Sequence, residues 1–201
     1  MSLPLLARHL DTLNDILASW REYQSLPSPE WRKDFFSIDT GGFVAKHQFK
    51  TRDDLSIAGI AAEVRACFEL ASIGKHILRL PENIPELIDD ITIDGRPYRE
   101  HLKFKPGETN PRGYPDAYFD GQTWDFKSPE FNNNIDSLRQ LIKDGRKADS
   151  IIFIVKKEGD IRMVEEALFR EIGRRRKDNS WHELPNVYYL LNGELICLWK
   201  K

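Results

Sequence analysis

The chain has 201 residues, of which 40% are hydrophobic and 31% charged, and its 11 Phe, 6 Tyr and 5 Trp exclude the aromatic-poor composition of a disordered protein. Thirty basic and 32 acidic residues give a net charge of -2, so there is no chain-wide electrostatic signature of nucleic-acid binding and any such surface must be a local patch. No run of about 18 apolar residues occurs, so we expect no membrane span.

The two cysteines, Cys67 and Cys197, both lie in apolar stretches. Such surroundings are typical of buried thiols in a reducing compartment, and they favour neither a disulfide framework nor a zinc site. The first 20 residues interleave charged side chains with apolar ones, unlike a signal peptide. We therefore expect a cytoplasmic protein.

Residues 3–25 are predicted to form an amphipathic helix, which the prolines of SLPSPEW end. Residues 31–50 show no clear period, so we treat 1–50 as an N-terminal helical lobe that leads into a domain at 51–201. A second helix is predicted from Thr51, a suitable N-cap, to Gly74, a suitable C-cap residue.

The segment KHILRLP, which follows this helix, reads as a strand, and residues 82–111 form a long insertion. Next comes a hairpin, with strands at 116–120 and 123–127 around the Asp120-Gly121 turn. The remaining pattern predicts a helix at about 133–147, a strand buried on both faces at 150–155, another helix, and a hairpin around Asn192-Gly193. We therefore expect an α/β fold whose mixed central sheet is flanked by helices.

The stretch GYPDAYFDGQTWDFKSPE, residues 113–130, places Asp116, Asp125 and Lys127 close together. Because successive side chains of a strand point to opposite faces, Asp125 and Lys127 project from the same face. Asp116 lies on the preceding strand, close enough to share a cation with Asp125. Carboxylates bind Mg²⁺ or Mn²⁺, which neutralise the charge that develops during phosphodiester hydrolysis. The pattern favours a nuclease site in which both aspartates bind the metal ion and Lys127 orients water or phosphate; a solvated hairpin is the alternative.

Pro-Asp at 115–116 followed by Asp-Phe-Lys at 125–127 resembles the signature of the PD-(D/E)xK, or restriction-endonuclease-like, nucleases. The resemblance implies an αβββαβ core, and the predicted order of elements agrees with it. It also implies a further acid on the helix that precedes the first strand. Glu63 lies on the apolar arc of that helix and Glu69 on the opposite side, so we favour Glu63 as the third catalytic and metal-binding acid.

The stretch from about Glu63 to Val155 has a narrower resemblance, carried by the Glu63 helix, GKHILRLPE, the hairpin and SPEFNNNIDSLRQLIKDGRKADSIIFIV. It is similar to the C-terminal nuclease domains of bacterial polymorphic and contact-dependent growth inhibition toxins, several of which cut tRNA or DNA. This implies nucleic acid as substrate, a cognate immunity protein as partner, and action in the cytoplasm of a target cell. The competing interpretation is an inactive nuclease-fold binding module in a mobile-element or defence complex.

Basic residues recur on the helix after the hairpin, at Arg139, Lys143 and Arg146, and Lys147 adjoins them. Such a row could bind phosphates near the cleavage site. A solvated helix face explains the same spacing. Whether the substrate is DNA or RNA stays open at this stage.

Overall fold

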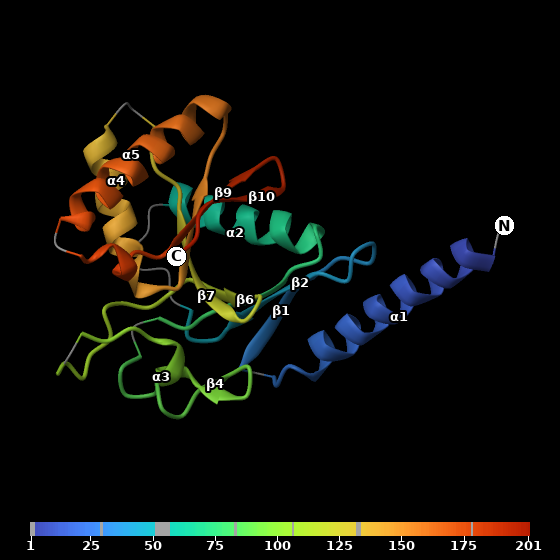
Figure 1. The fold of residues 1–201 in the computed structure, drawn as a ribbon. Helices are drawn as coiled ribbons and strands as arrows, with labels where there is room; N and C mark the ends of the chain where they lie inside the picture. The colour runs from blue at the N-terminus through green and yellow to red at the C-terminus, as the bar shows by residue number, and fades with distance from the viewer. Residues whose placement is uncertain are drawn as a thin grey trace.

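The computed structural model describes residues 3–28, 30–50, 57–82, 84–105, 107–131, 134–177 and 179–201. These residues form a mixed α/β fold with a large sheet and five α-helices (Figure 1). The helices are α1 (Leu3–Ser25), α2 (Ile57–Ser72), α3 (Tyr98–His101), α4 (Ile135–Asp144) and α5 (Glu158–Arg176). Two short 3-10 helices are η1 (Gly145–Lys147) and η2 (Trp181–Glu183).

The main sheet has eight strands in the order β1-β2-β3-β6-β7-β8-β9-β10. Strands β2 and β3 are parallel, as are β7, β8 and β9, and the other neighbours are antiparallel. The bounds are β1 (Trp31–Phe36), β2 (Phe43–His47), β3 (His76–Arg79), β6 (Ala117–Phe119), β7 (Gln122–Lys127), β8 (Ser150–Ile154), β9 (Asn186–Leu191) and β10 (Glu194–Trp199). A separate two-stranded sheet pairs β4 (Thr92–Ile93) with β5 (Arg96–Pro97).

One face of the main sheet packs on α2. Leu70 and Cys67 of α2 share a buried cluster with Ile77 of β3, Trp124 of β7 and Ile152 of β8. Apolar side chains at helical spacing on α2 therefore meet alternate residues of several strands, which is the expected way to bury an amphipathic helix.

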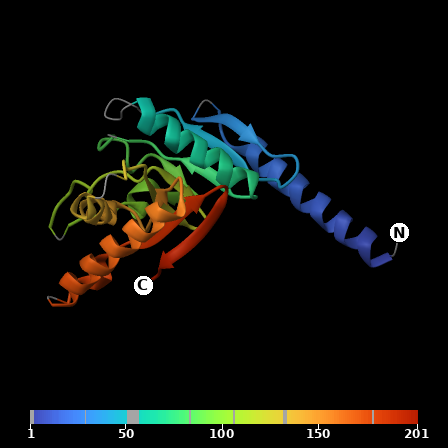
Figure 2. The same ribbon diagram turned by 90° about the horizontal axis from the view of Figure 1, so that it is seen from above.

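The opposite face is covered by two groups of elements. Figure 2 shows α2 and α5 on opposite sides of the strands. Helices α4 and α5 pack on Ile151 and Phe153 of β8. The 82–111 segment, with Tyr23 of α1, packs on Phe43 and Tyr118 of β2 and β6. Strand β8 is buried on both faces, which confirms the prediction and explains its continuous apolar run.

The predicted helices and hairpins lie where the sequence pattern places them. At both hairpin turns the backbone has positive φ, at Asp120 and Gly121 (51° and 74°) and at Asn192 and Gly193 (51° and 81°). Gly74 follows α2 with φ 92°, a conformation that suits glycine. The predicted cap at Thr51 lies outside the described residues.

Residues 31–47, expected to belong to a helical lobe, form strands β1 and β2 instead. Three successive residues of β2, Phe43, Val44 and Ala45, are buried, because Val44 faces the α2 cluster and its neighbours face the other side. A strand covered on both faces has no alternating pattern, which explains the missing period. Since β2 pairs with β3, this segment extends the main sheet.

Both edge strands are irregular. Pairing shifts register between Lys33 and Phe35 in β1 and between Cys197 and Trp199 in β10. Cys67 is buried as expected, but the prediction of a buried thiol is wrong for Cys197, which is exposed because it lies on edge strand β10.

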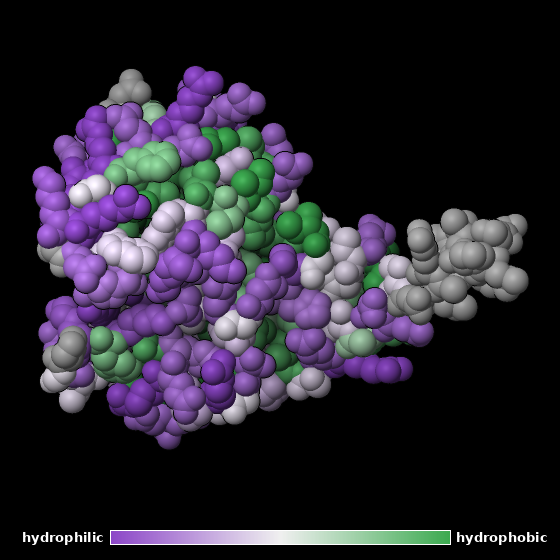
Figure 3. Space-filling model, viewed as in Figure 1, coloured by the Kyte–Doolittle hydropathy of each residue, from purple (hydrophilic) through white to green (hydrophobic). Residues whose placement is uncertain are grey.

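The surface in Figure 3 is mostly polar, and apolar residues gather over α2 and the β9–β10 hairpin. Phe68 and Ile73 of this region are 36% and 47% exposed. None of the helices in the described part of the chain has both the length and the apolar character that crossing a membrane requires.

Candidate active site

Two buried aspartates stand side by side in the middle of the main sheet. Asp116 directly precedes β6, and its backbone N–H donates to the Trp124 carbonyl at 2.8 Å. Its Oδ2 accepts a 2.7 Å hydrogen bond from the Phe126 N–H, which fixes the orientation of the carboxylate. Asp125, on β7, is only 1% exposed. The tight Asp120-Gly121 turn therefore brings two acids together on neighbouring strands.

The two carboxyl groups differ in their proton affinity. Burial and the neighbouring charge of Asp116 raise the pKa of Asp125. Burial also acts against ionisation of Asp116, but Lys147, Lys50 and the Phe126 N–H outweigh it and lower the pKa of Asp116. Two carboxyl groups in contact titrate as a pair, and the raised pKa is that of Asp125.

Two lysines approach this pair. Lys127 Nζ lies 2.6 Å from Asp125 Oδ2, yet this buried oxygen accepts no hydrogen bond in the described structure. Lys147, in η1, places Nζ 2.9 Å from Asp125 Oδ1 and 3.5 Å from Asp116 Oδ1. Although burial opposes it, the attraction of both aspartates raises the pKa of Lys147, which stays protonated. The aspartates are therefore held together by cations on both sides.

Glu63, on α2, joins the same cluster from the other face of the sheet. It is 4% exposed, and its Oε1 accepts hydrogen bonds from Arg79 Nη2 at 2.8 Å and Nε at 3.2 Å. Glu69 instead faces outward and pairs with Arg65 at 2.7 Å. Helical spacing thus separated the two glutamates as the structure does, and Glu63 serves here as a counter-charge for Arg79.

Lys50 connects the Glu63 side to the aspartates. Its side chain is 1% exposed, and Nζ contacts Glu82, lies 3.5 Å from Glu63 Oε1, and lies 3.7 Å from Asp116 Oδ1. Burial alone would lower the pKa of Lys50, but the surrounding carboxylates raise it above the ordinary value. Lys50 is therefore a buried cation among three acids.

A cavity of about 300 Å³ opens beside the two aspartates at the end of β7. It is bordered by Glu63, Asp116, Asp125, Lys127 and Lys147. The structure thus brings together all four residues that the sequence predicted as catalytic. It adds Lys147, which the sequence assigned to a phosphate-binding helix face.

The donor set suits a hard divalent cation. No group of three or more His, Cys, Asp or Glu side chains is arranged to hold a metal ion within the described ranges. Asp116 and Asp125 are nevertheless adjacent oxygen donors, and Asp125 Oδ2 has the Lys127 ammonium beside it without an aligned hydrogen bond. Mg²⁺ commonly binds through one or two carboxylates and keeps several waters. These two aspartates, with Glu63 paired to Arg79, are the residues that could hold the ion.

The predicted basic row on α4 is divided by the structure. Arg139 turns to α5, where its guanidinium lies 3.3 Å from Glu171, and it also contacts Asp136 at 2.7 Å. Lys143 and Arg146 line a second cavity. Because α4 packs on α5, Arg139 is used between the two helices, and Lys143 and Arg146 of the predicted row reach the second cavity.

Sequence reasoning missed Lys50, Arg79 and Glu82. One signal was available for Arg79: it alternates with Leu78 and Leu80 in an apolar strand, so it had to share the α2 face with Ile77 and to find a buried acid there. Lys50 and Glu82 lie in loops, and no local pattern predicts that they meet.

Comparisons of the chain with protein-family models, with curated protein sequences and with solved structures find no match. Function must therefore be inferred from the residues of this chain and from their geometry.

Proposed function

We propose that the protein is a divalent-metal-dependent nuclease that hydrolyses phosphodiester bonds in nucleic acid. In this proposal α2, β3, β6, β7, α4 and β8 form the αβββαβ core of a restriction-endonuclease-like fold. The observation that carries it is the pair of buried aspartates on neighbouring strands, with Lys127 and Lys147 beside them in one cavity. Like charges side by side in a cavity, surrounded by fixed cations, are typical of catalytic sites.

Each side chain has a role in this proposal. Asp116 and Asp125 would hold Mg²⁺ or Mn²⁺, which supplies charge neutralisation to the reacting phosphate when bound. Lys127 borders the cavity and is 14% exposed, so it can orient the attacking water or a phosphate oxygen. Lys147 adds positive charge where the phosphate would sit. Glu63 acts through Arg79 and Lys50 and positions the acids.

The toxin resemblance of the segment from Glu63 to Val155 extends this proposal. It favours tRNA or DNA as substrate and a cognate immunity protein as an inhibitory partner, with action in the cytoplasm. Positive charge around the cavity is compatible with either nucleic acid, because both present the same phosphodiester backbone.

The test is incubation of the purified protein with plasmid DNA and with total tRNA, each in Mg²⁺, Mn²⁺ or chelator. We expect cleavage that requires the metal ion. Lys127→Ala should lower the cleavage rate by about 10²–10⁴-fold while metal binding remains. Asp120→Asn is the control for a charge change elsewhere in the hairpin, and it should cleave like the wild type. Asp120 lies at the opposite end of the same hairpin and pairs with Lys75 at 2.6 Å. Binding of nucleic acid without cleavage under every condition would support the inactive binding module instead.

A further inference from the structure

A second cavity, of about 570 Å³, is almost entirely lined by cations. Its lining consists of one acid, Asp144, and six basic residues: Lys105, Arg112, Lys127, Lys143, Arg146 and Lys147. None of these lining residues is aromatic. The cavity therefore offers positive charge and hydrogen-bond donors without an aromatic surface on which a base could stack.

The cations come from separate parts of the chain. Lys105 belongs to the 82–111 insertion, where Phe104 and Pro111 form an isolated β-bridge, and Arg112 follows the insertion directly. The others come from the end of β7, the end of α4 and η1. A solvated helix face arises from one segment, whereas here the fold gathers like charges from several, which is unfavourable without an anionic ligand.

Acids beside the cavity offset part of this charge. Lys105 pairs with Glu108 at 3.1 Å, and Lys127 and Lys147 pair with the two aspartates. Glu183 is shared by three arginines: Oε2 lies 3.1 Å from Arg146 Nη1, 4.0 Å from Arg112 Nη1 and 3.9 Å from Arg175 Nη1. The Nε of Arg112 is buried and has no hydrogen-bond partner in the described structure. Lys143 forms no ion pair with any described residue. Lys143 and the Arg112 Nε–H are thus the donors that stay available for an anion.

Two lysines lie between the second cavity and the aspartate site, the cavity of about 300 Å³ that Asp116 and Asp125 line. Lys127 and Lys147 line both cavities, so the cationic cavity begins where the aspartate cavity ends. An anion bound in the second cavity would therefore lie next to the phosphate that the aspartate site is proposed to cut.

We propose that the second cavity is a phosphate subsite, which holds the phosphodiester adjacent to the one that is cleaved. The substrate is then a polynucleotide strand engaged through at least two successive phosphates, and the cavity recognises backbone rather than base. This inference rests on the proposed nuclease function and defines its substrate as a chain, in preference to a mononucleotide or a simple phosphate ester. The 82–111 insertion supplies part of the subsite.

The direct test measures binding of a fluorescently labelled single-stranded oligonucleotide in chelator, so that cleavage does not interfere. Arg112→Ala and Lys143→Ala should each weaken binding several-fold. Each should also reduce the slope of log K against log salt by about 0.7, the value for one lost phosphate contact on a single strand. Circular dichroism confirms that the variants are folded.

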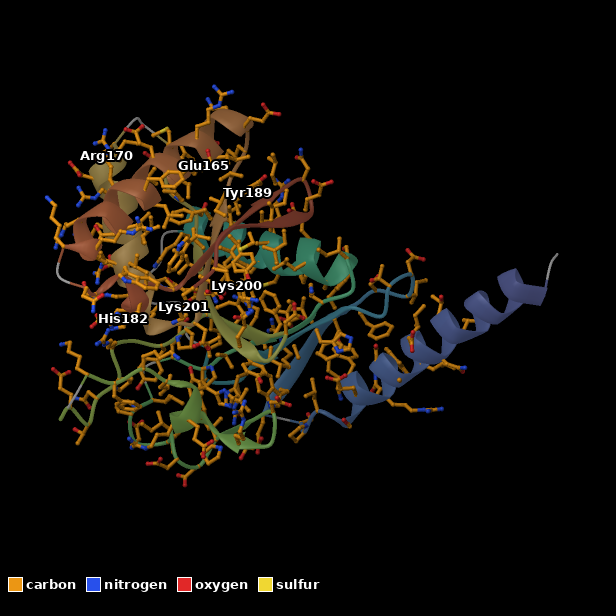
Figure 4. All side chains as sticks on the ribbon, viewed as in Figure 1. Glu165, Arg170, His182, Tyr189, Lys200 and Lys201 are labelled. Carbon is orange, nitrogen blue, oxygen red and sulfur yellow. The ribbon has the colours of Figure 1, made fainter. Side chains whose placement is uncertain are left out.

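Arg170→Ala is the matched control, because it removes the same charge from an exposed site on α5. Figure 4 shows Arg170 well separated from His182, whose neighbour Glu183 contacts Arg146 of the cavity. Arg170→Ala should bind like the wild type. If wild type and the Arg112 and Lys143 variants bind with equal affinity and equal salt slope, or if wild type does not bind, the subsite is wrong.

A second measurement separates this inference from the nuclease proposal. With bis(p-nitrophenyl) phosphate, which has one phosphate, Arg112→Ala should react at the wild-type rate, whereas its KM for the oligonucleotide should rise. Oligonucleotide binding that depends on Arg112 and Lys143, without cleavage by wild type, would refute the nuclease proposal and retain the subsite. Cleavage with unchanged KM in both variants would refute the subsite and retain the nuclease.

Discussion

Two clusters of buried charge in the described part of the molecule differ in construction. Between α4 and α5, the single acid Glu171 is fully buried, and it accepts a 2.8 Å hydrogen bond from Arg175 and a 3.3 Å hydrogen bond from Arg139. At the aspartate site two acids lie side by side, and Asp125 Oδ2 accepts no hydrogen bond although Lys127 is near. In the helical cluster each cation has a further acid, since Arg139 also contacts Asp136 and Arg175 lies near Glu183, whereas the aspartate site keeps two acids in contact.

The difference shows that buried charge alone does not indicate chemistry. A buried acid whose oxygens are both bonded to arginines stabilises the packing of two helices, since removing either partner leaves an unpaired charge. The neighbouring Asp116 raises the pKa of Asp125, a cost that a purely structural cluster avoids. The incompletely bonded oxygen and the cavity are what favour a reactive site at Asp125.

The largest expected effect comes from Asp125→Asn, which removes the charge and keeps the size. Cleavage and metal affinity should both fall by about 10²–10⁴-fold. The free energy of unfolding should change by no more than about 1 kcal/mol, because the repulsion from Asp116 is lost together with the attraction to the lysines. Isothermal titration with Mn²⁺, cleavage rates and urea denaturation measure the three quantities. Wild-type cleavage by a folded Asp125→Asn protein would end the nuclease assignment.

Glu171→Ala should have the opposite profile. It leaves Arg175 and Arg139 between α4 and α5 without their acid, so we expect a loss of about 3–5 kcal/mol in the free energy of unfolding. Cleavage per folded molecule should stay at the wild-type level. Urea denaturation and active-site titration of the folded fraction check this. A variant as stable as wild type would show that the helical cluster is not structural.

Lys50→Met tests the connection between Glu63, Glu82 and Asp116. Without the ammonium group the three acids lose a shared cation, and the free energy of unfolding should fall by about 1–3 kcal/mol. Mg²⁺ or Mn²⁺ should then raise the melting temperature of the variant more than that of wild type, because an added cation replaces the lost charge. An equal shift in both proteins would argue against this role for Lys50.

The smallest effect at neutral pH concerns a buried group that carries no charge there. Burial lowers the pKa of His47 from 6.5 to about 4, and its Nδ1 accepts a hydrogen bond from the Phe49 N–H at 3.2 Å. Between pH 6.5 and 4 His47 is protonated in the unfolded chain and neutral in the folded protein. The stability that neutral His47 contributes is therefore present above pH 6.5 and is lost as the pH falls towards 4. His47→Gln should flatten the pH dependence of the unfolding free energy in that window. An identical pH profile for the variant would show that His47 titrates normally.

Much of the fold was predictable where periodicity was strong. The 3–25 helix, the Asp120-Gly121 hairpin and the apolar run of β8 all follow from local rules of spacing and turn chemistry. Strand β2 was not predictable in this way, because neighbours cover it on both faces. The two-stranded sheet and α3 in the insertion are too short to give a period.

The site was predictable only in part for a related physical reason. Asp116, Asp125 and Lys127 lie within one hairpin, so local geometry brings them together. Glu63 was placed by the apolar face of its helix. Lys147 was read as part of a row on α4, but it follows the helix and η1 turns its side chain to the aspartates. Long-range contacts of this kind depend on packing, which no short sequence pattern encodes.

The two edge strands of the main sheet bear on how the protein avoids aggregation. An edge strand presents unpaired N–H and C=O groups, which can recruit a strand from another copy of the chain. In β1 and β10 the register shifts interrupt that row of groups, and Lys200 and Lys201 follow β10 directly. An irregular edge with flanking positive charge is a poor template for further pairing. The same irregularities that end the sheet's regular pairing therefore also keep it from growing by addition of strands.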